Sequence, residues 1–505
     1  MVSRNIIANS AARIWKVLIN LAFVPLYIHY LGMEAYGLIG FFATLQSVFS
    51  LMDLGWSTNL SRELAIHHHE AKSRGMLRDL LHTTEVSYLV AGTLIGIIVY
   101  AGVPVITRFW IHPQRLSLQA VTSAIRLLAL AITAQWPIKL YEAGLLGLER
   151  QQLNAVITSA SSTSRAIGAV GVLALISPSI NAFFIWQTVV SVATLLVLRT
   201  ALWSKLSLPN ARRKFRLSLL LATWQFAMGI TTITALSLVF SIGDKIVISA
   251  LLPLKTLGYY TLASQIGSAV AFLSLPIYYA VFPRFSSLLA TGNHLHLTRL
   301  YHRSSQLMSV TILPLVVIVA FYAQPLVFAW TGSLEIAAHL RWMLPILALG
   351  SGLNALSHTP YALQLANGWT RLAVISDTTL VAVLGPLLIL LTWRFGATGA
   401  ALIWLLYNAS NVFIVTPFMH RRLLVKEKWN WFLADVGHPL LAAVAVAIGA
   451  KYLLPYSMTR MEITLSIAFV GAVAGLAALA VTTELRTILW RRLNQIRTLA
   501  WLPEN

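Results

Sequence analysis

About fourteen apolar stretches, each roughly 20 residues long, occupy most of this 505-residue chain. A helix of about 20 residues is what crosses the roughly 30 Å hydrocarbon core of a membrane. The composition agrees, because 58% of the residues are hydrophobic and only 10% are charged, whereas soluble chains carry about 25% charged residues. The sequence therefore predicts an all-α polytopic membrane protein and excludes a soluble enzyme, a disordered protein and a nucleic-acid-binding domain. The predicted spans are residues 8–30, 37–60, 80–102, 118–146, 153–176, 180–200, 218–241, 257–282, 305–328, 338–365, 371–392, 397–419, 434–454 and 462–482.

The distribution of Lys and Arg predicts the topology. The chain has 37 Lys and Arg against 16 Asp and Glu, a net charge of +21. Membrane proteins gather Lys and Arg in their cytoplasmic loops, so this excess needs no nucleic-acid partner. With the N-terminus in the cytoplasm, the basic loop residues favour the cytoplasmic side by about three to one. We therefore expect an even number of spans with both termini cytoplasmic, and the first apolar stretch shows no cleavable signal peptide.

Two pairs of short motifs indicate an internal duplication. Residues 31–38 (LGMEAYGL) resemble residues 252–259 (LPLKTLGY), and residues 153–158 (LNAVIT) resemble residues 371–376 (RLAVIS), at nearly the same offset. The motifs predict two pseudo-symmetric six-helix lobes plus two C-terminal helices. Because six is even, both lobes insert the same way round, and we expect a cleft between them at the membrane midplane.

The predicted boundaries follow from this repeat. Residues 1–202 form the first lobe, and residues 203–217 form a basic cytoplasmic linker. Residues 218–420 form the second lobe, and residues 421–505 hold the last two helices and a basic cytoplasmic tail.

Five basic residues lie inside predicted spans, all of them in the first lobe: Arg13, Lys16, Arg126, Lys139 and Arg165. A charged Arg or Lys at the bilayer centre costs about 2.5–3.5 kcal/mol even on insertion scales, so such residues face a cavity or a partner. This asymmetry predicts a cationic cavity, lined mainly by the first lobe, that suits a phosphate or pyrophosphate.

Arg165 stands out among these five, because it lies near the middle of its span. It shares one helical face with Asn154, Thr158 and Ser161, which are spaced three or four residues apart.

Simpler explanations stay open for each cation. Arg13 and Lys16 lie near the cytoplasmic side and can snorkel to the interface. Lys139 can pair with Glu142 three residues later, and packing or pairing can hold Arg126 and Arg165.

Four acidic residues lie in or near spans: Asp53, Glu85, Glu142 and Asp377. A carboxylate at this depth is a candidate for binding a proton or Na⁺ that drives transport. Pairing with a neighbouring cation is the alternative.

No enzymatic motif is present. The chain has no Gly-rich phosphate loop followed by Lys-Ser or Lys-Thr and no His-Glu-x-x-His, so we expect no ATP-driven step, no metal and no cofactor. It contains no cysteine, which removes disulfides and thiol catalysis. We expect a protein that is not an enzyme.

Several motifs, taken together and in order, resemble a known family. They are residues 9–15 (NSAARIW), 25–28 (PLYI), 31–38, 51–55 (LMDLG), 62–65 (RELA), 144–150 (GLLGLER), 243–245 (GDK), 257–263 (LGYYTLA) and 282–283 (FP). From about residue 5 to residue 420 the chain resembles the polysaccharide-transporter family. That family includes O-antigen and exopolysaccharide repeat-unit flippases and belongs to the superfamily of multidrug, oligosaccharidyl-lipid and polysaccharide exporters.

The resemblance implies a bacterial inner-membrane protein with fourteen helices in two lobes. It implies translocation of undecaprenyl-diphosphate-linked oligosaccharide from the cytoplasmic to the periplasmic leaflet by alternating access. By this interpretation Arg126 and Arg165, helped by Arg13, Lys16 and Lys139, hold the pyrophosphate and acidic sugars. Glycan contacts are expected from Trp136, Trp224 and Gln225. Membrane lipids, a polysaccharide polymerase and chain-length proteins are the expected partners.

Three other functions remain open. A flippase for a lipid-linked peptidoglycan precursor is the nearest of them, and charge alone does not separate it. A multidrug antiporter of the same superfamily would favour acidic cavity residues for cationic drugs, whereas the in-span excess here is basic. A membrane enzyme that transfers or polymerises glycans would need a sizeable outward loop for its acceptor, and no loop of that size is evident.

Overall fold

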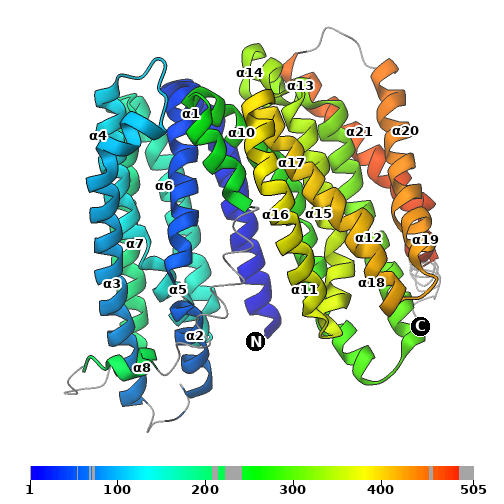
Figure 1. The fold of residues 1–505 in the computed structure, drawn as a ribbon, viewed down its shortest axis with the longest axis horizontal. Coiled ribbons are helices and arrows are strands. Elements are labelled where there is room, and N and C mark those ends of the chain that lie inside the picture. The colour runs from blue at the N-terminus through cyan, green and yellow to red at the C-terminus, as the bar shows by residue number, and fades with distance from the viewer. Residues whose placement is uncertain are drawn as a thin grey trace, which may run out of the picture. The chain divides into compact units, whose positions relative to one another are not determined.

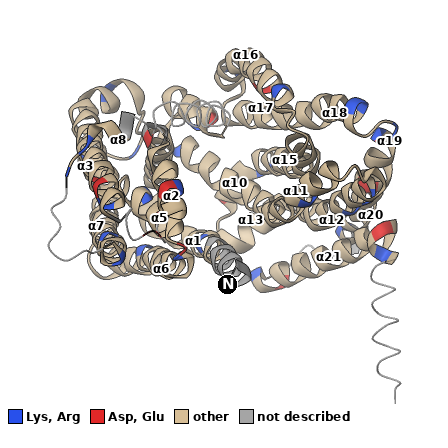
Figure 2. Ribbon diagram, turned by 90° about the horizontal axis from the view of Figure 1, so that it is seen from below, with Lys and Arg blue, Asp and Glu red and all other residues tan. Residues whose placement is uncertain are grey.

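The polypeptide is helical throughout the part that the structure describes. The computed structural model describes residues 2–53, 55–67, 70, 74–206, 214–221, 241–453 and 459–487, and these contain no strand (Figure 1). A chain in lipid must satisfy each backbone N–H and C=O internally, and long apolar helices do so. Most of each helix is tan in Figure 2, because so few residues are charged. The predicted all-α multi-pass class is confirmed.

Ten helices of the described chain are long and apolar enough to span a membrane, or eleven if the bent pair α14–α15 is one span. Three differences separate this from the predicted fourteen. First, the predicted spans 8–30 and 37–60 fall largely in the single helix α1. Second, helix α6, residues 151–175, is too polar to qualify as a span. Third, residues 222–240 lie outside the described residues. The number fourteen therefore stays a prediction.

The chain divides into two compact units, residues 1–258 and 259–505. The lobe, linker and tail boundaries stay predictions, and most of the predicted linker lies outside the described residues. The first unit holds α1 (Val2–Phe49), η1 (Ser50–Asp53), α2 (Trp56–His67), α3 (Arg74–Val105), η3 (Ile106–Trp110), α4 (Leu118–Gln135), α5 (Ile138–Gly147), α6 (Gln151–Leu175), α7 (Ile180–Lys205) and α8 (Leu217–Leu221), and α10 (Leu254–Phe272) begins at its end. The second unit continues with α11 (Ser274–Ala290), α12 (His294–Phe321), α13 (Ala323–Thr331), α14 (Leu334–Leu340), α15 (Met343–Ala366), α16 (Thr370–Phe395), α17 (Ala397–Ser410), η4 (Asn411–Val415), α18 (Thr416–Leu423), α19 (Lys428–Asn430), η5 (Trp431–Gly437), α20 (His438–Leu453) and α21 (Arg460–Val481).

Helix α1 is broken at Gly32. This residue has φ 80° and ψ 167°, outside the helical region, which glycine adopts without a Cβ penalty. A straight helix of 48 residues would measure about 72 Å, more than twice the hydrocarbon thickness. Figure 1 shows α1, at the blue end of the colour scale, as two arms instead of one rod. The break falls between the predicted spans 8–30 and 37–60.

The two repeated motifs meet within the first unit. Gly37 and Gly258 occupy the same position in residues 31–38 and 252–259. A Cβ on Gly37 would collide with the carbonyl oxygen of Leu254, and a Cβ on Gly258 would collide with that of Met33. Met33 and Leu254 are themselves equivalent in the two motifs. Such a reciprocal contact is the pattern of a local twofold axis.

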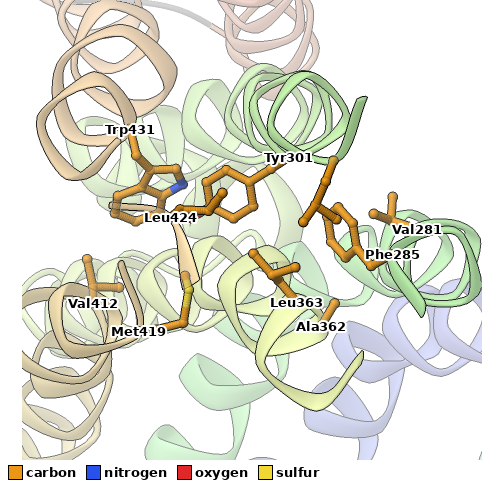
Figure 3. Close-up of a cluster of buried hydrophobic side chains, with 10 residues drawn as sticks. Val281, Phe285, Tyr301, Ala362, Leu363, Val412, Met419, Leu424 and Trp431 are labelled. Atoms are coloured by element: carbon orange, nitrogen blue, oxygen red, sulfur yellow. The ribbon is translucent and has the colours of Figure 1, made fainter. Parts of the chain in front are cut away.

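Helix pairs within each unit bury the core. In the first unit α6 packs against α1 and α7, and α4 packs against α3 and α7. In the second unit α15 packs against α11, α12 and α17, and α12 also contacts α20 and α21. Figure 3 shows one buried cluster of the second unit, formed by Val281, Phe285, Leu297, Tyr301, Ala362, Leu363, Val412, Met419, Leu424 and Trp431.

Candidate functional site

Arg165 lies about halfway along α6 and is half-buried. Its Nη1 donates to the side-chain oxygen of Gln187 at 3.1 Å and to the backbone oxygen of Gln187 at 3.4 Å. Gln187 belongs to α7 and is itself buried. The polar face of α6 predicted from its spacing thus packs towards α7, and Ser161 contacts Thr194 of α7 at 2.6 Å.

The contact with Gln187 extends into a network across four helices. Ser191 donates to the Gln187 backbone oxygen at 2.5 Å, and the Gln135 side chain donates to Ser191 at 2.9 Å. The Gln46 side chain of α1 donates in turn to Gln135 of α4. We call Gln46, Gln135, Ser191, Gln187 and Arg165 the polar network. It fixes the guanidinium inside an otherwise apolar helix bundle.

Every other member of the polar network is uncharged. Among the described residues no carboxylate lies within ion-pair distance of Arg165. Neutral acceptors orient a guanidinium but leave its positive charge uncompensated. A charge kept at this depth at a cost of about 2.5–3.5 kcal/mol is characteristic of a functional residue. The arrangement suits an anionic ligand, since guanidinium groups bind phosphate oxygens in a bidentate manner.

The remaining predicted cations lie in different surroundings. Arg126 is exposed on α4 and lies over the ring of Tyr100 at 5.7 Å. Lys16 is exposed on α1, and the side chain of Arg13 lies outside the described part of the chain. The structure shows no contact between Arg126 and Arg165 among the residues it describes, so their shared cavity stays a prediction.

Lys139 has a carboxylate partner. Its Nζ lies 3.2 Å from Asp53, which is buried. Asp53 also accepts from the backbone N–H and the hydroxyl of Ser57, at 3.2 and 2.8 Å, at the start of α2. Glu142, half-buried, interacts electrostatically with Lys16 and Lys139. The direct partner of Lys139 is therefore Asp53, 86 residues earlier in the chain, and not the expected Glu142.

Glu85 is a buried acidic residue with several partners. Its carboxylate accepts from Arg199 at 2.5 Å, from the Tyr141 hydroxyl at 2.7 Å and from the Trp203 indole at 3.1 Å. This set joins α3, α5 and α7. A carboxylate with three donors, one of them its counter-ion Arg199, serves packing well and leaves little capacity for a transported cation.

Asp377 differs from the other acidic candidates. It is half-buried on α16 and accepts from the Tyr407 hydroxyl of α17 at 3.1 Å. No basic residue pairs with it among the described residues. Its predicted role in ion coupling remains a prediction.

The aromatic candidates are only partly covered by the structure. Trp136 is buried, donates to the backbone oxygen of Phe49 at 3.1 Å and stacks on Tyr88 at 4.6 Å. These contacts make Trp136 a packing residue of the first unit. Trp224 and Gln225 lie outside the described residues.

Sequence reasoning missed the three glutamines of the polar network. The available signal was Gln46, Gln135 and Gln187 standing alone in apolar helices. Such amides are costly in lipid without partners. It also missed a buried His302–Asp435 contact in the second unit, since neither residue stands out from its charged neighbours in the sequence.

The described chain is an all-helical bundle with ten or eleven apolar candidate spans, which defines a multi-pass membrane protein. A family model described as "Polysaccharide biosynthesis protein" matches residues 2–289, more than half of the chain. The chain belongs to this family, as the motifs indicated.

Individual relatives agree with the family. A Shigella flexneri protein named "Putative O-antigen transporter" is 23% identical over 381 residues, covering 74% of this chain and 87% of that protein. The fold is similar to that of the lipid II flippase MurJ in an inward closed conformation, with a TM-score of 0.74, 14% identity and coverage of 97% and 99%. It also resembles an inward-facing multidrug transporter of the MATE family, with a TM-score of 0.64, 14% identity and coverage of 81% and 94%.

Proposed function

We propose that the protein is a flippase for undecaprenyl-diphosphate-linked oligosaccharide, an O-antigen or exopolysaccharide repeat unit. It moves this lipid from the cytoplasmic to the periplasmic leaflet of the bacterial inner membrane by alternating access. The observation that carries the proposal is Arg165, a half-buried cation that neutral groups orient and that has no carboxylate partner among the described residues. The family match supports the glycan part of the substrate.

The pyrophosphate is the group that Arg165 suits. Its negative charges must leave water during translocation, and an oriented guanidinium offsets part of that desolvation cost. Arg126, Lys16, Arg13 and Lys139 are proposed to assist, with Lys139 the least available because Asp53 pairs with it. Closure of the protein around a bound lipid-linked anion follows if the occluded state binds it more tightly.

The multidrug antiporter is the second candidate, because MATE structures share the fold. A cationic drug would need an available carboxylate. Asp53 and Glu85 are each neutralised by a basic residue, whereas Asp377 and Glu142 have no ion-pair partner among the described residues. A glycan-transferring enzyme is the third candidate, and none of the described contacts favours it.

Deletion of the gene tests the proposed function. We expect surface glycan to disappear and lipid-linked repeat units to accumulate in the cytoplasmic leaflet, measured by leaflet-selective enzymatic labelling. Unchanged glycan together with sensitivity to cationic dyes would instead establish the multidrug exporter. Glycosyltransferase activity of membranes holding only this protein would establish the enzyme.

Substitutions in the polar network test Arg165 itself. Arg165→Ala should abolish surface glycan at near-normal protein abundance, and Arg165→Lys should retain part of it, because a lysine keeps the charge but lacks the bidentate geometry. Gln187→Ala should cause a partial loss by releasing the guanidinium. Arg115→Ala is the control, an exposed cation in the segment before α4 that belongs neither to the polar network nor to the proposed site. Normal glycan in Arg165→Ala would remove Arg165 from the site.

A further inference from the structure

An imidazole lies between two carboxylates in the second unit. The Nδ1 of His302, on α12, is 2.6 Å from Asp435 Oδ2, and its Nε2 is 3.0 Å from Glu427 Oε2. Asp435 is 1% exposed and His302 is 7% exposed, whereas the Glu427 side chain is 30% exposed. The three groups therefore run from a buried end at Asp435 to a solvent-facing end at Glu427.

The number of protons on these groups follows from the geometry. A neutral imidazole has a single N–H, so donation to both carboxylates requires the imidazolium form. An imidazolium with two carboxylates carries one net negative charge. Addition of one further proton, onto a carboxylate, makes the set neutral. A buried set of groups with a net charge is costly in an apolar surrounding, so this step has a driving force.

We propose that His302, Asp435 and Glu427 form a proton-binding site that couples transport to the proton gradient. The ligand is one proton taken from water at Glu427. The transport part rests on the proposed function above, whereas the binding of a proton does not.

The charged groups around the site do not neutralise its two carboxylates. His420 of α18 lies within electrostatic range of His302 and Glu427, and Lys428 of α19 lies within range of His420. Arg303, next to His302, pairs with Glu484 at 3.4 Å, so its charge is balanced. Among the described residues no cation other than His302 lies within ion-pair distance of Asp435 or Glu427.

The local backbone and one orphan atom give independent support. Asp435 lies in η5, a π-helix, and such turns occur frequently at functional sites. Lys426, directly before Glu427, has φ 76°, which is uncommon for a residue with a side chain. His420 is 1% exposed and its Nδ1 has no hydrogen-bond partner, while its Nε2 contacts the Tyr301 hydroxyl at 2.9 Å. Each such feature destabilises the fold by about 1–3 kcal/mol, and features of this kind are found most often at functional sites.

The site has a structural means of transmitting protonation. Asp435 joins α12 to η5, and it also accepts from Gln306 at 2.9 Å. Gln306 in turn accepts from the backbone N–H of Glu484 at 3.1 Å, in the helical segment 483–487 after α21. A protonated carboxyl offers a donor where the carboxylate offered an acceptor, so the contact with His302 must rearrange. Proton binding thus changes how α12 is held against α19, η5 and the segment 483–487.

Infrared difference spectroscopy of the purified protein between pH 5 and pH 8 tests proton binding directly. We expect a carboxylic-acid C=O band in the wild type that is absent in Glu427→Gln or in Asp435→Asn. Arg303→Gln is the matched control, because it removes a charge next to His302 without touching the site, and it should keep the band. Glu427 is partly exposed, so Glu427→Gln gives a result even if Asp435→Asn does not fold. A band unchanged in both variants would overturn the proposal.

Transport in proteoliposomes tests the coupling. One proton per cycle predicts that a gradient of one pH unit changes the leaflet ratio of lipid-linked oligosaccharide about tenfold. In Glu427→Gln and His302→Gln this ratio should stay near one, while exchange without a gradient continues. A tenfold ratio retained in both variants contradicts the coupling. If the wild type moves no such lipid, the proposed function fails, and the infrared result still decides the proton site.

Discussion

Glu85 shows what a buried carboxylate does when its partners are complete. Three donors, from Arg199, Tyr141 and Trp203, converge on a side chain that is 3% exposed. Because all three partners donate, only a group that accepts on both oxygens satisfies them. The residue therefore stabilises the packing of α3 against α5 and α7.

Glu85→Gln should lower the stability of the first unit. The amide nitrogen of glutamine is a donor and would face donors, which leaves buried groups unpaired at a cost of roughly 1–3 kcal/mol. Arg199 is partly exposed, which keeps the loss towards the lower end. Thermal unfolding in detergent measures it, with the exposed Glu149→Gln as the control. Equal melting temperatures for the two variants would contradict this role.

Single residues were predictable where cost alone singled them out. Arg165 could be chosen from its depth in a span and its polar face, since both are properties of one helix. Its partner Gln187 could not, because the pairing depends on how α6 packs against α7. Asp53 was a candidate for ion coupling, and only the fold brings Lys139 within 3.2 Å of it. His302 and Asp435, 133 residues apart, lie beyond any local pattern.

At the scale of helices, the glycine contact between the repeated motifs has the tightest geometry. Gly37 and Gly258 each lie against a backbone carbonyl of the other motif. Backbone cannot move aside as a flexible side chain does, so a methyl group at either position forces the segments apart.

Gly37→Ala and Gly258→Ala should each destabilise the first unit by about 1–3 kcal/mol, the usual range for overpacking. Gly475→Ala, in α21, is the control. A Cβ there meets nothing within 4 Å, so alanine should be neutral or stabilising by about 0.5–1 kcal/mol. Melting temperatures of the three variants in detergent decide the matter. A Gly37→Ala protein as stable as Gly475→Ala would show that the contact is loose.

The helices themselves were predictable to a large extent, because about 20 apolar residues in a row have few alternatives in a membrane. The helical stretches of 118–147, 180–205 and 370–395 correspond closely to predicted spans. Two features were not. Two predicted spans form one long helix, α1, which is interrupted only by the non-helical backbone of Gly32. The π-helix at η5 depends on side-chain contacts that periodicity does not encode.

For the whole molecule, the topology is the property that the charges predict. The distribution of basic loop residues predicts that both termini are cytoplasmic, and this prediction is open to a direct test because the chain has no cysteine. Any introduced thiol is therefore the only one present.

His294→Cys, at the start of α12, should react with a membrane-impermeant maleimide only after the inner membrane is permeabilised. Arg394→Cys, at the end of α16, should react in intact spheroplasts. Both positions are exposed, so access to the reagent and not burial decides the labelling. The reverse pattern would place both termini outside and would invert the direction proposed for transport.

Helix α6 also has a consequence for how the chain enters the membrane. It is the helix that carries Arg165, and it is too polar to count among the apolar spans. The translocon releases segments into lipid according to their apolarity. An arginine at the centre of a segment makes the free energy of its insertion less favourable by about 2.5–3.5 kcal/mol. Arg165 and Ser161 of α6 contact Gln187 and Thr194, which belong to the next helix, α7. Helix α7 is strongly apolar. We therefore expect α6 to insert only together with α7, as a helical hairpin. A nascent chain that ends after residue 175 should leave α6 outside the bilayer.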